Sequence, residues 1–152
     1  NLTFTTADKG VHLGVTSANA VNLIHDYEEG TWTPAFATGF YAENGYQVQS
    51  GKYVKIGNTV ICQYYLYTAS SGWTSNGAQI TMSGLPFTTG ATTRAFGGVG
   101  YSTMMSKNPQ VYSYQNGTSL IFYVDGDDDF TRGSNHTGGS SMYVIGGCVY
   151  TI

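Results

Sequence analysis

Three carboxylates stand close together near the start of the chain, at Asp26, Glu28 and Glu29. Two carboxyl groups at a fixed distance across a sugar can serve as the acid and the nucleophile or base of a glycoside hydrolase. These three, however, stand at the entry to the first predicted strand of the body, and Lys52 and Lys55 follow in a later one. We therefore expect capping, ion pairs with these lysines, or contacts with a neighbouring subunit, and no enzymatic activity.

A second acidic group lies in the segment VDGDDDF. Its alternating carboxylates at Asp125, Asp127 and Asp129 resemble the oxygen-rich start of a calcium loop, but Gly126 is misplaced for an EF-hand and no distal Glu follows. A solvated turn is the other interpretation, because Asp and Gly both favour turns. We expect no cofactor, with Ca²⁺ at these three aspartates as the alternative.

Aromatic residues offer binding chemistry, because sugar C–H faces stack on Trp and Tyr while amides hydrogen-bond to hydroxyls. The segment TASSGWTSNGA holds Trp73 and Asn76, and we expect it to be an exposed loop between strands that end at Tyr67 and begin near Gln79. With Tyr65 and Tyr67 beside them, these residues form the predicted receptor-binding set. Packing of Trp73 beneath its own loop is the alternative, since tryptophan is heavily buried on average.

Alternating apolar residues predict the strands that hold these side chains. The run VICQYYLYTA follows GKYVKI through Gly57-Asn58, which predicts a tight hairpin. A second hairpin is predicted around Asn116-Gly117, with a type I′ turn. Its register sets two cross-strand pairs, Val111 with Phe122 and Tyr112 with Ile121.

Further strands are expected at TWTPAF, AQITMSG, AFGGVGYSTMM and SMYVIGGCVYTI, for a total of about eight. Glycines interrupt the last two of these, where a bulge or a closely approaching backbone is typical; they are Gly97, Gly98, Gly100, Gly146 and Gly147. The chain holds 21 Gly and 13 Tyr among 152 residues. This composition favours an all-β protein and excludes a helical bundle.

Charge is scarce, at 10% of residues against about 25% in ordinary globular domains. The net charge of −3 excludes binding of nucleic acid through a basic groove, and no apolar run is long enough for membrane insertion. No charged residue occurs from 56 to 93. Because monomers usually carry mixed surface charge, this stretch indicates an obligate oligomer.

We expect residues 1–29 to form a neck or linker with short strands and residues 30–152 to form the body. The first residue is not Met, so we expect a piece of a longer protein. Cys62 and Cys148 lie in apolar strands, which predicts buried free thiols, with a bridge between them as the alternative.

Three segments carry a family resemblance: NLIHDYEEGTWTP at 22–34, GKYVKIGNTVICQYYL at 51–66 and ITMSGLPF at 80–87. In this order and spacing they resemble the C-terminal module of many tailed-bacteriophage tail fibres and tailspikes. The resemblance covers about the first 90 residues. His25 departs from the pattern, because an acidic residue is expected there.

The resemblance implies an antiparallel β-sandwich, often jelly-roll-like, that forms a homotrimer at the distal end of a fibre in the virion. It implies binding rather than chemistry. The implied partners are the shaft of the fibre or tailspike and a bacterial surface polysaccharide or lipopolysaccharide. A trimerisation cap that binds no ligand is the main alternative, and a glycan-cleaving or esterase domain is a third.

Overall fold

The computed structural model describes residues 3, 5–6, 9–14, 16–17, 23–24, 26–42, 44–69, 73–103, 109–124 and 141–152. All ordered elements in these ranges are strands, so the all-β prediction is confirmed. The same ranges contain no helix able to cross a membrane. The predicted calcium ligands Asp125, Asp127 and Asp129, together with His25, lie outside the described residues.

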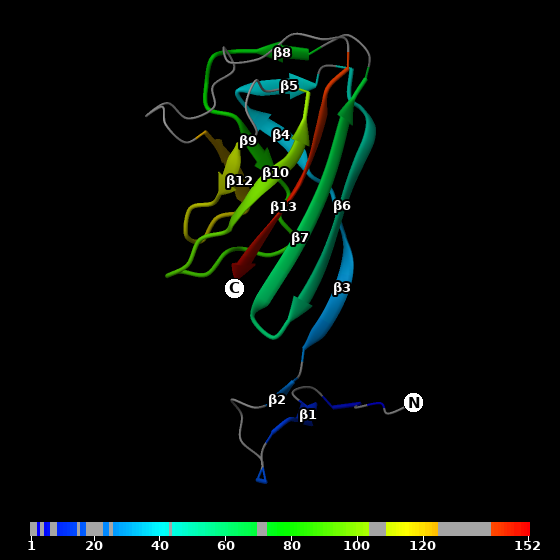
Figure 1. The fold of residues 1–152 in the computed structure, drawn as a ribbon, viewed down its shortest axis with the longest axis vertical. Helices are drawn as coiled ribbons and strands as arrows, with labels where there is room; N and C mark the ends of the chain where they lie inside the picture. Colours follow the sequence, from blue (N-terminus) through cyan, green and yellow to red (C-terminus); the bar gives the residue numbers. More distant parts are fainter. Residues whose placement is uncertain are drawn as a thin grey trace.

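One large antiparallel sheet makes up the body of the molecule (Figure 1). Every neighbouring pair of strands in it is antiparallel, as the sequence predicts. In spatial order its strands are β3 (Tyr27–Trp32), β6 (Tyr46–Ile56), β7 (Thr59–Thr68), β13 (Tyr143–Thr151), β10 (Phe96–Ser102), β11 (Gln110–Tyr112), β12 (Ser119–Tyr123), β9 (Thr81–Ser83) and β4 (Ala35–Thr38).

The sheet curls back on itself, because its two edge strands are consecutive in the chain. Only Thr33 and Pro34 separate the end of β3 from the start of β4, although these strands occupy opposite edges. The prediction of a single strand over TWTPAF is therefore wrong. Proline has no backbone N–H to donate to a ladder, so the strand breaks at this point. The Pro34 carbonyl instead accepts a hydrogen bond from Gln49 Nε2 at 2.9 Å.

The inside of the curl holds a single apolar core. Alternate residues of β7 point into it, and so do residues from β13, β9 and β12. Aromatic contacts join distant parts of the chain, with the Phe36 ring 4.7 Å from Phe40 and 6.2 Å from Phe122. The fully buried residues of this core include Val60, Leu66, Ile80, Met82, Leu120, Phe122 and Val144.

Two glycines of the paired strands β3 and β6 lie directly beneath aromatic rings. Gly51 is paired with Trp32, and a methyl group on this glycine would come within 2.6 Å of the indole Cδ1. Gly30 is paired with Tyr53, and a methyl group there would come within 2.9 Å of the phenol ring. Each strand thus supplies one ring and one glycine, which explains the spacing of aromatic and glycine residues in DYEEGTW and GKYVKI.

The three segments that carry the family resemblance pack against one another. Lys55 is buried, forms an ion pair with Asp26, and has its ammonium group 5.7 Å from the centre of the Phe87 ring. The Phe87 ring also makes an edge-to-face contact with Tyr53 at 5.3 Å. The middle segment therefore contacts the other two, and the expected ion pair with Lys55 is confirmed.

Both predicted hairpins form, but only one has a tight turn. β6 and β7 pair from Ile56 opposite Thr59, so Gly57-Asn58 is the two-residue turn that the sequence predicts. The predicted pairs Val111–Phe122 and Tyr112–Ile121 of the second hairpin are also confirmed. Its turn is longer than predicted, because the ladder between β11 and β12 ends at the pair Tyr112–Ile121. The backbone N–H groups of residues 116 and 117 instead donate to Thr89.

Two small two-stranded sheets complete the described structure (Figure 1). β1 (Val11–His12) pairs with β2 (Leu23–Ile24) before the large sheet begins. β5 (Phe40–Ala42) pairs with β8 (Trp73–Ser75) at the opposite end of the molecule. The expectation that Trp73 lies in a loop is therefore wrong, because its backbone pairs with Ala42.

Cys62 and Cys148 are free and buried, as predicted, and lie directly opposite each other on β7 and β13. Hydrogen bonding with Cys62, together with burial, raises the pKa of the Cys148 thiol. We expect a thiol reagent to label neither cysteine rapidly in the native protein, and both rapidly in denaturant. Rapid native labelling, or an intact mass that lacks two hydrogens, would contradict this expectation.

Candidate functional site

The outer side of five adjacent strands carries exposed side chains with binding chemistry. Side chains alternate between the core and solvent along β3, β6, β7, β13 and β10. Residues that are opposite in register therefore form rows across these strands. We call this side of the five strands the outward face.

An apolar strip occupies the end of the outward face nearest the neck. Phe96 is 66% exposed and Ile61 is 50% exposed, and Val149 lies between them in the ladder. Val54 is opposite Ile61, and Ile56 follows on the same side of β6. We call these five residues the apolar strip. None of these five side chains is charged. Ile56 directly precedes the Gly57-Asn58 turn, in which the Gly57 N–H donates to the backbone carbonyl of Asp26.

Four tyrosines gather at the other end of the same face: Tyr65, Tyr67, Tyr101 and Tyr143, which we call the tyrosine cluster. The rings of Tyr67 and Tyr143 stack with centres 4.1 Å apart and an angle of 10° between their planes. Tyr65 lies nearly parallel to Tyr143 at 6.3 Å. Tyr101 is tilted at 6.4 Å from Tyr143 and is more than half exposed.

Side-chain hydrogen bonding accompanies the stacking of Tyr67 on Tyr143. The bond with Tyr143 lowers the pKa of Tyr67, and bonds with Ser141 and Gln47 act in the same direction. The same Tyr67–Tyr143 bond raises the pKa of Tyr143 to about 12. Because the rings are held in place, a ligand that stacks on them would not have to order them first.

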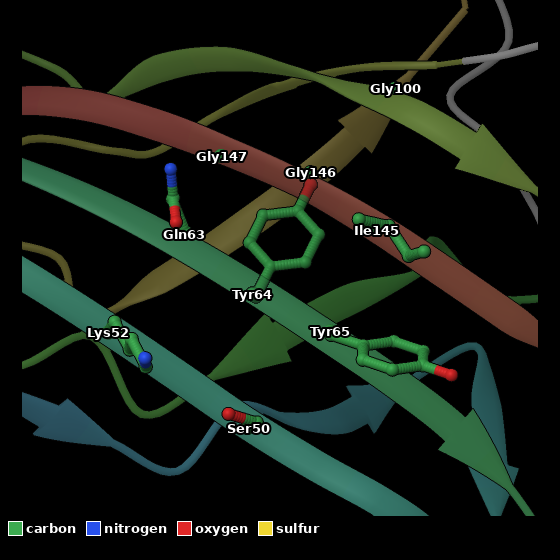
Figure 2. A pocket seen from close by; sticks show the side chains of 9 residues that line it. All are labelled: Ser50, Lys52, Gln63, Tyr64, Tyr65, Gly100, Ile145, Gly146 and Gly147. Atoms are coloured by element: carbon green, nitrogen blue, oxygen red, sulfur yellow. The ribbon is translucent and has the colours of Figure 1, made fainter.

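A hollow of about 560 Å³ adjoins the tyrosine cluster. Figure 2 shows Lys52, Gln63, Tyr65 and Ile145 rising from three neighbouring strands around it. The buried Tyr64 lies opposite Gly146 of β13 on the core side of the sheet, and its hydroxyl donates to the Gly98 carbonyl at 3.4 Å. Burial raises the pKa of Tyr64, which keeps this hydroxyl protonated. The remaining lining residues are Ser50, Gly100, Gly146 and Gly147.

Each carboxylate of residues 26–29 has its own partner. Asp26 forms the ion pair with Lys55 described above, and Glu28 accepts a hydrogen bond from the Tyr53 hydroxyl. Glu29 accepts one from Tyr27 at 3.0 Å. Hydrogen bonds to these glutamates raise the pKa of both tyrosines. This arrangement joins β3 to β6 and supports the structural interpretation of the three acids over the catalytic one.

The predicted receptor-binding residues occupy two places. Tyr65 and Tyr67 lie together on the outward face, whereas Asn76 follows β8 of the small sheet. Asn76 donates to the Tyr41 hydroxyl at 3.1 Å and accepts from the Ala78 N–H at 3.0 Å. The backbone of Trp73 lies in β8, and its side chain is outside the described structure.

The sequence prediction missed Tyr101, Tyr143, Lys52 and Gln63 as members of a site. The alternation in SMYVIGGCVY placed Tyr143 on the same side of its strand as Ile145, but no local signal named its neighbouring strands. Among the described residues, no three His, Cys, Asp or Glu side chains lie close enough together to hold a metal ion. Comparisons with protein-family models, curated proteins and solved structures find no match for this chain.

Proposed function

We propose that this chain is the non-enzymatic distal domain of a phage tail fibre or tailspike, which assembles as a homotrimer and attaches the virion to a host-surface glycan. The curled sheet is then the jelly-roll-like sandwich that the resemblance implies. Support comes from the motif segments DYEEGTWTP, GKYVKI and SGLPF, which resemble that family and pack against one another in the fold.

The observation that carries the proposal is the division of the outward face into two chemically different ends. The apolar strip lies beside the neck, where a shaft would bring copies of the chain together. Exposed contiguous apolar surface of this kind marks protein–protein contact. None of the five side chains is charged, and Glu29, which is opposite Val54 at the edge of the strip, accepts a hydrogen bond from Tyr27. We assign it to contact between copies of this chain.

The tyrosine cluster stands at the end of the face away from the neck, where a host surface would meet a fibre tip. Its four rings offer aromatic faces and hydroxyl groups, which suit the C–H faces and hydroxyls of sugars. The carboxylates of residues 26–29 are engaged with lysine and tyrosine, which favours binding over hydrolysis.

The assembly half of the proposal is tested by light scattering. We expect the purified chain to have three times the mass of the 16.3 kDa single chain at micromolar concentration. Ile61→Asp combined with Phe96→Asp should release monomers, because two carboxylates would be buried in each contact without partners. Thr31→Asp is the control, since Thr31 is exposed on the same face outside the apolar strip. A wild-type mass near 16.3 kDa would contradict the assembly.

A further inference from the structure

A row of polar residues and glycines crosses the outward face between the apolar strip and the tyrosine cluster. Its members are opposite one another in register on five successive strands: Thr31, Lys52, Gln63, Gly147 and Gly98. Five strands at a spacing of about 4.8 Å give the row a length of about 19 Å. The flanking rows carry bulkier side chains, with Ile61 and Phe96 on one side and Tyr65 and Tyr101 on the other.

The glycines make this row a furrow. A methyl group added to Gly98 would meet no atom within 4 Å, so the space above it is open. A methyl group on the nearby Gly100 would touch only the Ile145 carbonyl oxygen, at 3.8 Å. Gln63 stands at the centre of the furrow, because it lines three hollows, which have volumes of about 560, 540 and 360 Å³. The face therefore has room for an extended ligand chain, which is more than the space that a single small group needs.

Charge is distributed unequally along the furrow. Lys52 is exposed, and the described residues supply no ion-pair partner for it. The 560 Å³ hollow has this one positive group and no acidic residue in its lining. The 540 Å³ hollow on the other side of Lys52 also contains Glu29, whose carboxylate accepts from Tyr27. Lys52 lines both hollows, so an anionic group is favoured more in the first hollow than in the second, where Glu29 offsets the positive charge.

We propose that the furrow binds an acidic saccharide chain, with the carboxylate of a hexuronic acid unit held by Lys52 in the hollow of Figure 2. Gln63 and Ser50 supply hydrogen bonds to the hydroxyls, and the Tyr65 ring offers a stacking face. This inference rests on the proposed function, and it adds the class of glycan and the residue that selects it.

A matched pair of probes tests the charge selection: a hexuronate oligosaccharide and the same oligosaccharide with its carboxyl groups reduced to alcohols. Calorimetric titration should show the acidic form bound about tenfold more tightly, as expected for one hydrogen bond to a charged group. Lys52→Gln should remove this preference. Arg94→Gln changes net charge equally at a residue that stands over Tyr114, away from the furrow, and should leave the preference intact.

A second variant tests the location without changing charge. Gly100→Leu should fill the hollow and weaken both probes, while circular dichroism and mass stay unchanged because its Cβ meets no close contact. Equal affinity for the two probes, or an unchanged preference in Lys52→Gln, would overturn the acidic specificity. If neutral glycans bind through the tyrosine cluster in that case, the proposed function stands. If no saccharide binds at all, both proposals fail.

Discussion

Replacing Trp32 by alanine is expected to lower the free energy of unfolding by about 3–5 kcal/mol, which is the range for a large buried aromatic side chain. Trp32 is 6% exposed and makes an edge-to-face contact with Tyr64 at 6.4 Å. Its indole N–H donates to the carbonyl of Gln63 at 3.1 Å and, more weakly, to that of Lys52 at 3.3 Å. The ring also covers Gly51, so its loss opens a cavity above a residue that has no side chain to fill it.

Trp32→Phe separates the ring from its hydrogen bonds. This variant keeps an aromatic ring over Gly51 and loses the indole N–H, so we expect a smaller loss than for alanine. Urea denaturation at one fixed protein concentration measures both variants, because assembly of copies makes stability depend on concentration. A loss below about 1 kcal/mol for Trp32→Ala would show that the pairing of β3 with β6 does not depend on this ring.

Removing the stacked pair by Tyr67→Ala and Tyr143→Ala is expected to abolish measurable attachment to a glycan surface. Each ring contributes about 1–3 kcal/mol if it acts as a binding hot spot. Three copies on one fibre tip multiply the effect, since multivalent attachment depends steeply on the affinity of each site. The measurement is binding of the trimer to an array of bacterial surface saccharides, compared with wild type.

Tyr27→Ala is the matched control for the tyrosine cluster. Tyr27 is an exposed tyrosine at the neck end of the same face, outside the cluster, and it bonds to Glu29. We expect this variant to bind as wild type does, with the same mass. Loss of binding in both variants would place the attachment elsewhere than the cluster, and loss of the trimer in Tyr67→Ala with Tyr143→Ala would reassign these rings to assembly.

Local patterns predicted those parts of the fold that depend on neighbouring residues. The alternation in VICQYYLYTA placed Tyr65 and Tyr67 on one side of a strand, and the Asn116-Gly117 pair set a register that the structure confirms. The glycines of the last two long strands were also interpreted correctly. A bulge lies between Val99 and Tyr101, and Gly97 lies against the Gly147 carbonyl.

Non-local pairing explains what the sequence did not predict. Thr33 and Pro34 separate one edge strand from the other, and nothing in TWTPAF shows that the two halves belong to opposite edges of a curled sheet. The tyrosine cluster depends on β13 lying between β7 and β10, which join residues far apart in the chain. Trp73 was placed in a loop from its polar neighbours, whereas pairing with β5 draws its backbone into a strand.

The central claim is that this chain is an attachment domain for a surface glycan. Adsorption of the purified chain to intact bacteria tests this claim most directly. A panel of strains is used, each compared with a derivative that lacks its surface polysaccharide or lipopolysaccharide. The account predicts that the chain binds at least one parent strain, that binding disappears with the polysaccharide, and that the Tyr67→Ala, Tyr143→Ala variant does not bind. Binding to no glycan-bearing strain, with the trimer intact, would contradict the claim and leave a structural cap without a ligand.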